Sequence, residues 1–128
     1  VISDDSGLCI KSLNNKPGIY SARLAKKHGS FFKAMKYILK KMVNKKNRRA
    51  TFVCSLSYKN KGGKIISVIG KIDGNISTKI IGKKGFGYDP IFIPLNKKIT
   101  FSQMSKSLKM RIDHRFIAFQ KLKKKIRI

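Results

Sequence analysis

The chain has 128 residues and a mass of 14.5 kDa, which suffices for one domain with a buried core and excludes two full domains. Its formal net charge is +26, but 25 of the 31 cationic residues are lysines that are scattered through every segment. This distribution favours compositional bias over a dedicated nucleic-acid-binding patch. We still expect loose association with polyanions. Apolar runs are only a few residues long and no secretion leader opens the sequence, so we expect no membrane span and a cytoplasmic protein.

The first predicted strand carries two adjacent carboxylates. Asp4 and Asp5 stand in a chain with three other acidic residues and no glutamate. Hard oxygen ligands beside Ser6 and Gly7 suit a Mg²⁺ ion that carries a phosphate substrate. Because adjacent strand residues point to opposite faces, the pair is poorly placed to act as the two carboxylates of a glycosidase. From this segment alone, an ordinary Asp-Asp-Ser-Gly turn is the alternative.

A turn and a helix are predicted next. The cluster NNKPG at 14–18 ends the first strand in an ordered loop. From Ser30, which is a plausible N-cap, apolar residues recur every three or four positions and predict one amphipathic helix that ends near Asn44. The residues of its predicted apolar face are Phe32, Met35, Ile38 or Leu39, and Met42.

The middle of the chain predicts three antiparallel strands in succession. Residues 51–58, TFVCSLSY, alternate strictly between apolar and other side chains. The glycines at 62–63 then turn the chain into KIISVIGKI, which predicts a hairpin. The sequence DGN at 73–75 is a second turn signal, and it leads to a third predicted strand at 76–81. The predicted apolar face of the first of these strands consists of Phe52, Cys54, Leu56 and Tyr58.

The two cysteines of the sequence are far apart and belong to no CxxC pair. Neither a zinc site nor a disulfide framework is indicated, because both need closer or more numerous cysteines. Cys9 and Cys54 each lie in an apolar run that is typical of a strand. We therefore expect two small buried side chains in a reduced, cytosolic protein.

A glycine-rich segment follows the predicted strands. Residues 83–89, KKGFGYD, place Phe86 between two glycines, which let the backbone bend sharply and a flat ligand approach the ring. Such an aromatic side chain can stack on a base. The alternative is a glycine-rich turn in which Phe86 and Tyr88 fill the core. It is no Walker loop, because the terminal Gly-Lys-Ser/Thr is missing.

Two short helical patterns follow Thr100, and the second begins at Asp113. Aspartate is a good N-cap, so His114 and Arg115 fall in the first helical turn. A helix N-terminus with an imidazole and a guanidinium attracts an anion or a base that carries a carbonyl group. An ordinary capped helix with solvated side chains is the alternative. The predicted apolar face of this last helix consists of Ala118, Leu122 and Ile126.

These elements predict a single α/β domain over 1–128, with a mixed, largely antiparallel central sheet flanked by helices. Four motifs in this order resemble those of the Ham1 family, the inosine/xanthosine triphosphate pyrophosphatases that remove non-canonical purine nucleotides. The resemblance covers essentially the whole chain and implies an ITPase-like fold whose N-terminal part is missing, since the family's N-terminal phosphate loop has no counterpart here. The motifs are SDDSGL at 3–8, PGIYSAR at 17–23, GFGYDPIF at 85–92 and DHR at 113–115.

The resemblance implies Mg²⁺-dependent hydrolysis of ITP, dITP or XTP to the monophosphate and pyrophosphate by a homodimer. By resemblance, Asp5 is the proton acceptor and a magnesium ligand, and Asp4 assists the metal. Hydrogen-bond donors that meet the purine 6-keto oxygen would set the specificity, because the amino group of adenine would be mispaired. The substrate-binding residues that the resemblance implies are Ser6, Phe86, Gly87, Tyr88, Asp89, Lys109, His114 and Arg115.

The chain also departs from the family's pattern. Gln103 stands where the family commonly has glutamate, and Asp113 replaces the usual serine before His-Arg, which preserves a cap. Two other hypotheses stay open from the sequence. One is a basic nucleic-acid-binding module, which would need clustered cations and exposed aromatic side chains. The other is an inactive, decayed fragment of the pyrophosphatase.

Overall fold

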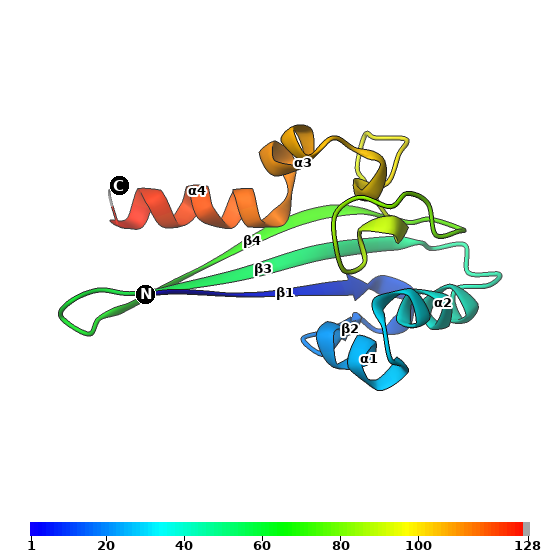
Figure 1. The fold of residues 1–128 in the computed structure, drawn as a ribbon, viewed down its shortest axis with the longest axis horizontal. Coiled ribbons are helices and arrows are strands. Elements are labelled where there is room, and N and C mark those ends of the chain that lie inside the picture. The colour runs from blue at the N-terminus through cyan, green and yellow to red at the C-terminus, as the bar shows by residue number, and fades with distance from the viewer. Residues whose placement is uncertain (127–128) are drawn as a thin grey trace.

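The computed structural model describes residues 1–126 of the chain. Within them, one sheet has the strand order β2-β1-β3-β4-β5, and every neighbouring pair is antiparallel (Figure 1). This confirms the predicted α/β class with a largely antiparallel sheet. The strands are β1 (Ile2–Ile10), β2 (Lys16–Gly18), β3 (Arg49–Lys59), β4 (Ile65–Ile76) and β5 (Phe92–Pro94). The helices are α1 (Ser21–His28), α2 (Phe31–Lys41), α3 (Lys106–Ile112) and α4 (His114–Ile126), with 3-10 turns at Lys11–Leu13, Asp89–Ile91 and Phe101–Gln103.

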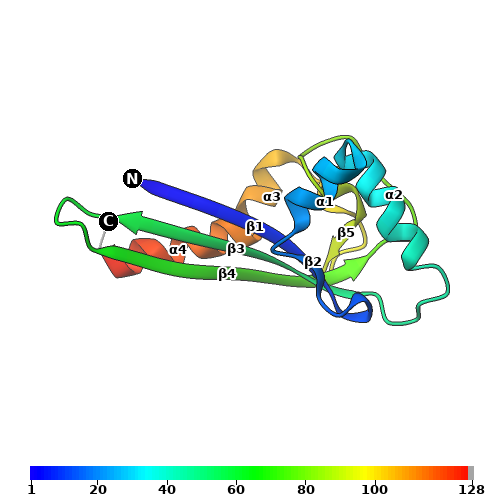
Figure 2. The ribbon, with the colours of Figure 1, turned by 90° about the horizontal axis from the view of Figure 1, so that it is seen from below.

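The helices divide the long sheet between them. Figures 1 and 2 show α4 lying along β3 and β4, whereas α1 and α2 gather at the far end of the sheet beside β2. The helix α3 lies between these two groups (Figure 2). The part of the chain that the structure describes contains no helix that is both long and apolar enough to cross a bilayer.

The hairpin of β3 and β4 forms as the alternation in the sequence predicts. Phe52, Cys54 and Leu56 are buried on one face of β3. The predicted third strand at 76–81 is wrong, because β4 runs straight through 73–75 to Ile76 and its next partner is β5. The glycine of this segment serves strand packing and not a turn. A Cβ on Gly74 would overlap the carbonyl oxygen of Ile93 in β5, so the close approach of the two strands requires glycine.

The helix predicted from Ser30 is α2. Ser30 caps it, because its Oγ accepts a hydrogen bond from the Lys33 N–H at 3.1 Å. Phe32 is wrongly assigned to the buried face, since it is 56% exposed and Ala34 is buried in its place. The helix α1 was not predicted: the two residues that it buries, Ser21 and Ala25, are small, and its one large apolar residue, Leu24, is only partly buried against the core.

Two hydrophobic clusters stabilise the fold. The larger one packs α2 and the 3-10 turns against β1, β3 and β5, and its fully buried residues include Ile10, Ile38 and Phe92. The smaller one lies under α4, where Leu122 packs on Cys54 and their neighbours in the hairpin. Both cysteines are free thiols; Cys54 is buried as the sequence predicts, whereas Cys9 is only partly buried.

The helix α4 lies very close to the sheet at Gly70 in β4. A Cβ at this position would overlap the carbonyl oxygen of His114 and the backbone nitrogen of Ala118. Backbone atoms of a packed helix cannot move aside, so we expect Gly70→Val to lower the free energy of unfolding by about 3 kcal/mol, measured by urea denaturation. Gly62→Ala in the hairpin turn is the control, because its nearest atom lies 3.4 Å away, and it should cost less than about 0.5 kcal/mol. Equal losses in the two variants would contradict this packing.

Candidate functional site

A cavity of about 250 Å³ opens where β1, the glycine-rich segment, α3 and the start of α4 meet. We call it the Asp5 cavity. All ten residues that the sequence singled out as metal, catalytic or substrate-binding residues line it, although they come from four separate segments of the chain. The fold therefore brings every predicted site residue to one place.

The two adjacent carboxylates of β1 have different surroundings. Asp4 pairs in register with Leu56 and Asp5 with Ser55, so the two side chains start from opposite faces of the strand. Arg115 Nε donates a hydrogen bond to Asp4 Oδ2 at 2.9 Å, in a partly exposed ion pair. Asp5 is exposed and forms no ion pair within residues 1–126. Arg115 therefore holds one carboxylate, and the other is free to meet water, a cation or a ligand.

A buried ion pair joins the glycine-rich segment to α3. Lys109 Nζ lies 2.8 Å from Asp89 Oδ2, and the two side chains are only 10% and 4% exposed. The same carboxylate oxygen accepts a hydrogen bond from the Phe86 N–H at 3.1 Å. Burial raises the pKa of Asp89, and the neighbouring Lys109 opposes that rise. Asp89 thus fixes both the lysine and the backbone of the segment beside the cavity.

The two aromatic residues of the glycine-rich segment have opposite placements. Tyr88 is buried, and its hydroxyl donates a hydrogen bond to the Ser21 carbonyl oxygen at 2.5 Å. Burial raises the pKa of Tyr88 to about 12, so it stays protonated. Phe86 is 59% exposed, which excludes a role in the core. Lys109 Nζ and Arg115 Cζ lie 4.6 and 4.7 Å from the centre of its ring, so an open aromatic ring stands next to two cations.

The start of α4 brings an uncharged histidine into the cavity. Asp113 caps the helix as predicted, because its Oδ1 accepts a hydrogen bond from the Phe116 N–H at 2.8 Å. His114 is buried and stacks on Phe52 with 4.7 Å between ring centres, so it is not the solvated side chain of the alternative hypothesis. Burial, with a smaller effect of Arg115, lowers the pKa of His114 to about 3. The imidazole is therefore neutral at neutral pH.

Two buried polar atoms of the cavity lack a partner. His114 Nδ1 and Ser6 Oγ form no hydrogen bond of normal geometry with any of the described residues, although the Ser6 hydroxyl lies close enough to the Cys54 thiol to oppose the rise in the pKa of Cys54 that burial causes. Buried polar groups are normally paired, because leaving one unpaired costs free energy. Both atoms belong to residues that line the Asp5 cavity, so a polar ligand there could supply the missing partners.

Reasoning from the sequence missed some residues of the cavity wall. Ser21 is the most connected of them: its Oγ accepts a hydrogen bond from the Leu8 N–H at 2.9 Å and donates one to the Gly18 carbonyl oxygen at 2.7 Å. It lies in the PGIYSAR motif, which could have pointed to it. Phe31, which packs edge-on against Tyr88, had no such signal.

Comparison with known proteins gives a consistent result. The sequence matches the Ham1 family over residues 1–125. A protein of Clostridium tetani named dITP/XTP pyrophosphatase is 38% identical over 99% of this chain and 63% of its own length. A protein of the same name from Borreliella burgdorferi is 46% identical over 97% of this chain and 64% of its own length. The chain thus spans a little under two thirds of the length of these curated relatives.

Solved structures agree with the sequence comparison. The Ham1 protein of Staphylococcus aureus superimposes with a TM-score of 0.92 at 39% identity, over 99% of this chain and 66% of that chain. A HAM1 protein from Coxiella burnetii gives a TM-score of 0.88 at 31% identity, over 98% of this chain and 66% of that chain. The α/β fold described above is therefore the fold of these proteins.

Proposed function

The chain belongs to the Ham1 family, and from this membership we propose that it carries the catalytic centre of a nucleoside triphosphate pyrophosphatase. The proposed substrates are dITP, ITP and XTP, which would be converted to the monophosphate and pyrophosphate in the house-cleaning of nucleotide pools. The names of the curated relatives support this activity. The observation that carries it is the Asp5 cavity, where a free carboxylate, two cations and an open aromatic ring stand together.

In the proposed complex, the purine base stacks on Phe86. Stacking on an exposed aromatic side chain tolerates any base, so it contributes affinity and not selection. Selection would fall to polar groups beside the ring. Arg115 can donate to a 6-keto oxygen, and the neutral His114 and Ser6 have unpaired polar atoms for the ligand. Adenine carries an amino group in place of the 6-keto oxygen, so a hydrogen-bond donor of the base would face the donor of Arg115 and both would stay unpaired.

The proposed reaction is hydrolysis between the α- and β-phosphates. A water molecule attacks the α-phosphorus, the bond from that phosphorus to the bridging oxygen breaks, and pyrophosphate leaves with the bonding electrons. Asp5 accepts the proton of the attacking water, since its carboxylate has no ion-pair partner among residues 1–126. Lys109 and Arg115 offset the negative charge that the departing pyrophosphate gains.

We propose that Mg²⁺ is the cofactor. Within the described residues, no group of three or more His, Cys, Asp or Glu side chains is placed to hold a metal. Magnesium usually takes only one or two carboxylates and completes its shell with water and substrate phosphates, so the donors present fit this ion. Asp5 would hold it, and Asp4, which is bound to Arg115, would assist. When bound, the ion neutralises phosphate charge.

We also propose that the protein works as a homodimer in the cytoplasm. The dimer rests on the family resemblance alone, and size-exclusion chromatography with light scattering tests it. Two free thiols, Cys9 and Cys54, suit a reducing compartment, which supports the cytoplasmic location.

The proposed activity predicts a preference for 6-keto purines. In a polypeptide that carries this chain at the length of its curated relatives, kcat/KM for dITP should exceed that for dATP by about 10- to 100-fold, because each mispaired buried polar group costs about 1–3 kcal/mol. Pyrophosphate release with the two nucleotides at equal Mg²⁺ measures the ratio. Equal rates would contradict the house-cleaning function even if pyrophosphate were released.

The net charge supports a further, non-specific property, which is weak binding to nucleic acid. Lysine contacts to phosphates release counterions, so the affinity for a DNA duplex should fall by about two orders of magnitude or more between about 50 and 200 mM salt, without sequence preference. Fluorescence anisotropy with two unrelated duplexes measures both effects. A tight, sequence-selective complex at physiological salt would instead favour a nucleic-acid-binding module.

A further inference from the structure

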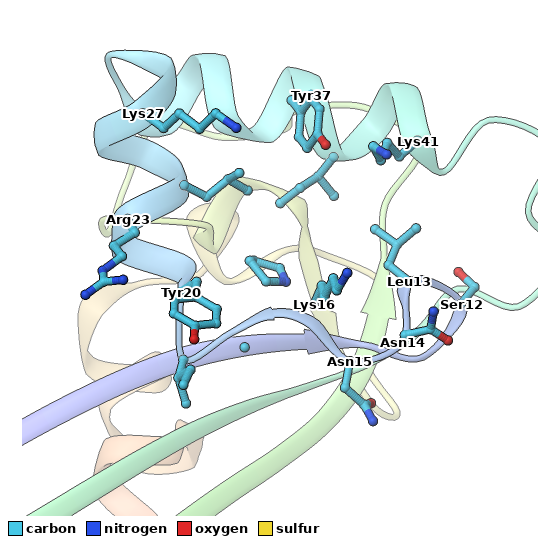
Figure 3. A pocket seen from close by; sticks show the side chains of 15 residues that line it. Ser12, Leu13, Asn14, Asn15, Lys16, Tyr20, Arg23, Lys27, Tyr37 and Lys41 are labelled. Atoms are coloured by element: carbon cyan, nitrogen blue, oxygen red, sulfur yellow. The ribbon is translucent and has the colours of Figure 1, made fainter.

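A larger hollow lies on another part of the molecule, between the loop that follows β1, the helix α1 and the helix α2 (Figure 3). Its volume is about 720 Å³, which falls in the range of small-molecule sites. We call it the basic pocket, because four of its fifteen lining residues are cationic and none is acidic. The cationic residues are Lys16, Arg23, Lys27 and Lys41.

The basic pocket is distinct from the Asp5 cavity, with which it shares no lining residue. The segment at the start of α1 separates the two. Ser21 and Ala22 line the Asp5 cavity, whereas Tyr20 before them and Arg23 after them line the basic pocket. A ligand in one hollow therefore need not displace a ligand in the other.

Charge alone does not single out this pocket, since lysines are spread over the whole chain. Its distinguishing feature is the combination of cations with aromatic rings around an apolar floor of Leu13, Leu24 and Ile38. Tyr20 is 54% exposed, and Arg23 Cζ lies 5.5 Å from the centre of its ring. An open ring beside a guanidinium offers a stacking surface for a planar group.

The opposite wall of the basic pocket repeats this combination. Lys41 Nζ lies 5.4 Å from the centre of the Tyr37 ring, which also packs on His28 at 4.5 Å between ring centres. In the view of Figure 3, Tyr37 lies between Lys27 and Lys41, and Lys16 lies below them in the middle of the hollow. Three lysines thus line one hollow of about 720 Å³, which has room for a phosphate chain.

We propose that the basic pocket binds a nucleoside di- or triphosphate. The phosphates would be held by Lys16, Lys27 and Lys41, and the base would stack on Tyr20. A ligand with several negative charges and one planar ring matches this wall, because the cations offset the charge and the ring covers the apolar floor. The proposal does not rest on the pyrophosphatase activity, since it concerns binding at residues outside the Asp5 cavity.

Residue-resolved binding to the 128-residue chain tests the proposal. ADP is added to ¹⁵N-labelled protein, and amide shifts are followed by NMR. We expect saturable shifts at Leu13, Tyr20 and Tyr37, whether or not Phe86 and Arg115 in the Asp5 cavity also respond. Shifts confined to the Asp5 cavity would overturn the proposal, and so would the binding of a single-stranded oligonucleotide without binding of ADP.

Matched variants separate the pocket from the overall charge. Lys27→Gln with Lys41→Gln should weaken ADP binding at the basic pocket at least about tenfold, whereas Lys123→Gln with Lys124→Gln on α4 removes the same charge elsewhere and should change it less than twofold. Equal weakening by the two pairs would show a general charge effect and overturn the proposal. Tyr20→Ala should weaken ADP binding and leave inorganic tripolyphosphate unaffected, because tripolyphosphate has no base. If ADP and tripolyphosphate respond alike to Tyr20→Ala, the ligand class is wrong.

Discussion

Asp5→Asn is expected to lower kcat for the release of pyrophosphate from dITP by about 10²- to 10⁴-fold, the range that general acid–base groups contribute. An amide cannot accept the proton of the attacking water, and it is a weaker ligand for Mg²⁺ than a carboxylate. The fold should be unaffected, because Asp5 is exposed and forms no ion pair within residues 1–126. Steady-state kinetics on the polypeptide of the relatives' length, with circular dichroism on the same samples, measures both.

Asp73→Asn is the matched control for this substitution. Asp73 lies on β4 outside the Asp5 cavity, where its Oδ1 accepts a hydrogen bond from Thr51 Oγ1 at 2.7 Å. The same change of charge there should alter kcat less than twofold. A wild-type-like rate from Asp5→Asn would remove Asp5 from the mechanism, and a comparable loss in both variants would point to a general effect of charge.

Arg115→Ala should have the second largest effect. We expect kcat/KM for dITP to fall by about 10²- to 10³-fold, as when a preorganised donor to the transition state is removed. The ratio of kcat/KM for dITP to that for dATP should also narrow, because in the proposal Arg115 both offsets phosphate charge and selects the base. Arg115→Lys keeps the charge and loses the planar fork of donors, so it should restore part of the rate and little of the preference.

Phe86→Ala is the comparison variant that distinguishes a residue that stacks on the base from one that selects the base. It should weaken dITP and dATP alike, by about 1–3 kcal/mol in kcat/KM, because stacking on an aromatic ring tolerates any base. If Arg115→Ala slowed both nucleotides equally and kept the preference, Arg115 would serve charge alone. Another residue would then have to select the 6-keto group.

Local patterns explain which parts of the fold could be predicted. The alternation at 51–58, the apolar period after Ser30 and the cap at Asp113 are signals within a few residues, and each element forms where its signal lies. Gly74 in the sequence DGN was misinterpreted as part of a turn. A glycine is required there because β5 packs closely against it, and the neighbouring residues in the sequence give no sign of that contact. The helix α1 has only eight residues and one large apolar side chain, Leu24, so its apolar face is too short to stand out in the sequence.

For the candidate site as well, the sequence could predict some features and not others. Its ten residues could be named because four motifs together resemble a family, and the fold gathers them in one cavity. Their partners could not be named from the sequence. The ion pair between Asp4 and Arg115 joins residues 111 positions apart, and no local spacing predicts the contact of Lys109 with Asp89. The basic pocket was missed for a related reason, since its walls come from three segments whose proximity no local sequence pattern predicts.

The pairing of β1 with β3 has a consequence for the order in which the protein folds. Lys59 pairs with Ile65 across a short turn, so β3 and β4 can pair through contacts between residues that are close in sequence. Ile2 pairs with Tyr58, and the chain between them includes α1 and α2, so this closure costs far more chain entropy. We therefore expect the hairpin to form early and β1 to join it late. Because β1 carries Asp5, the cavity would be completed only as folding finishes, and ligand binding would report the last step of chain assembly.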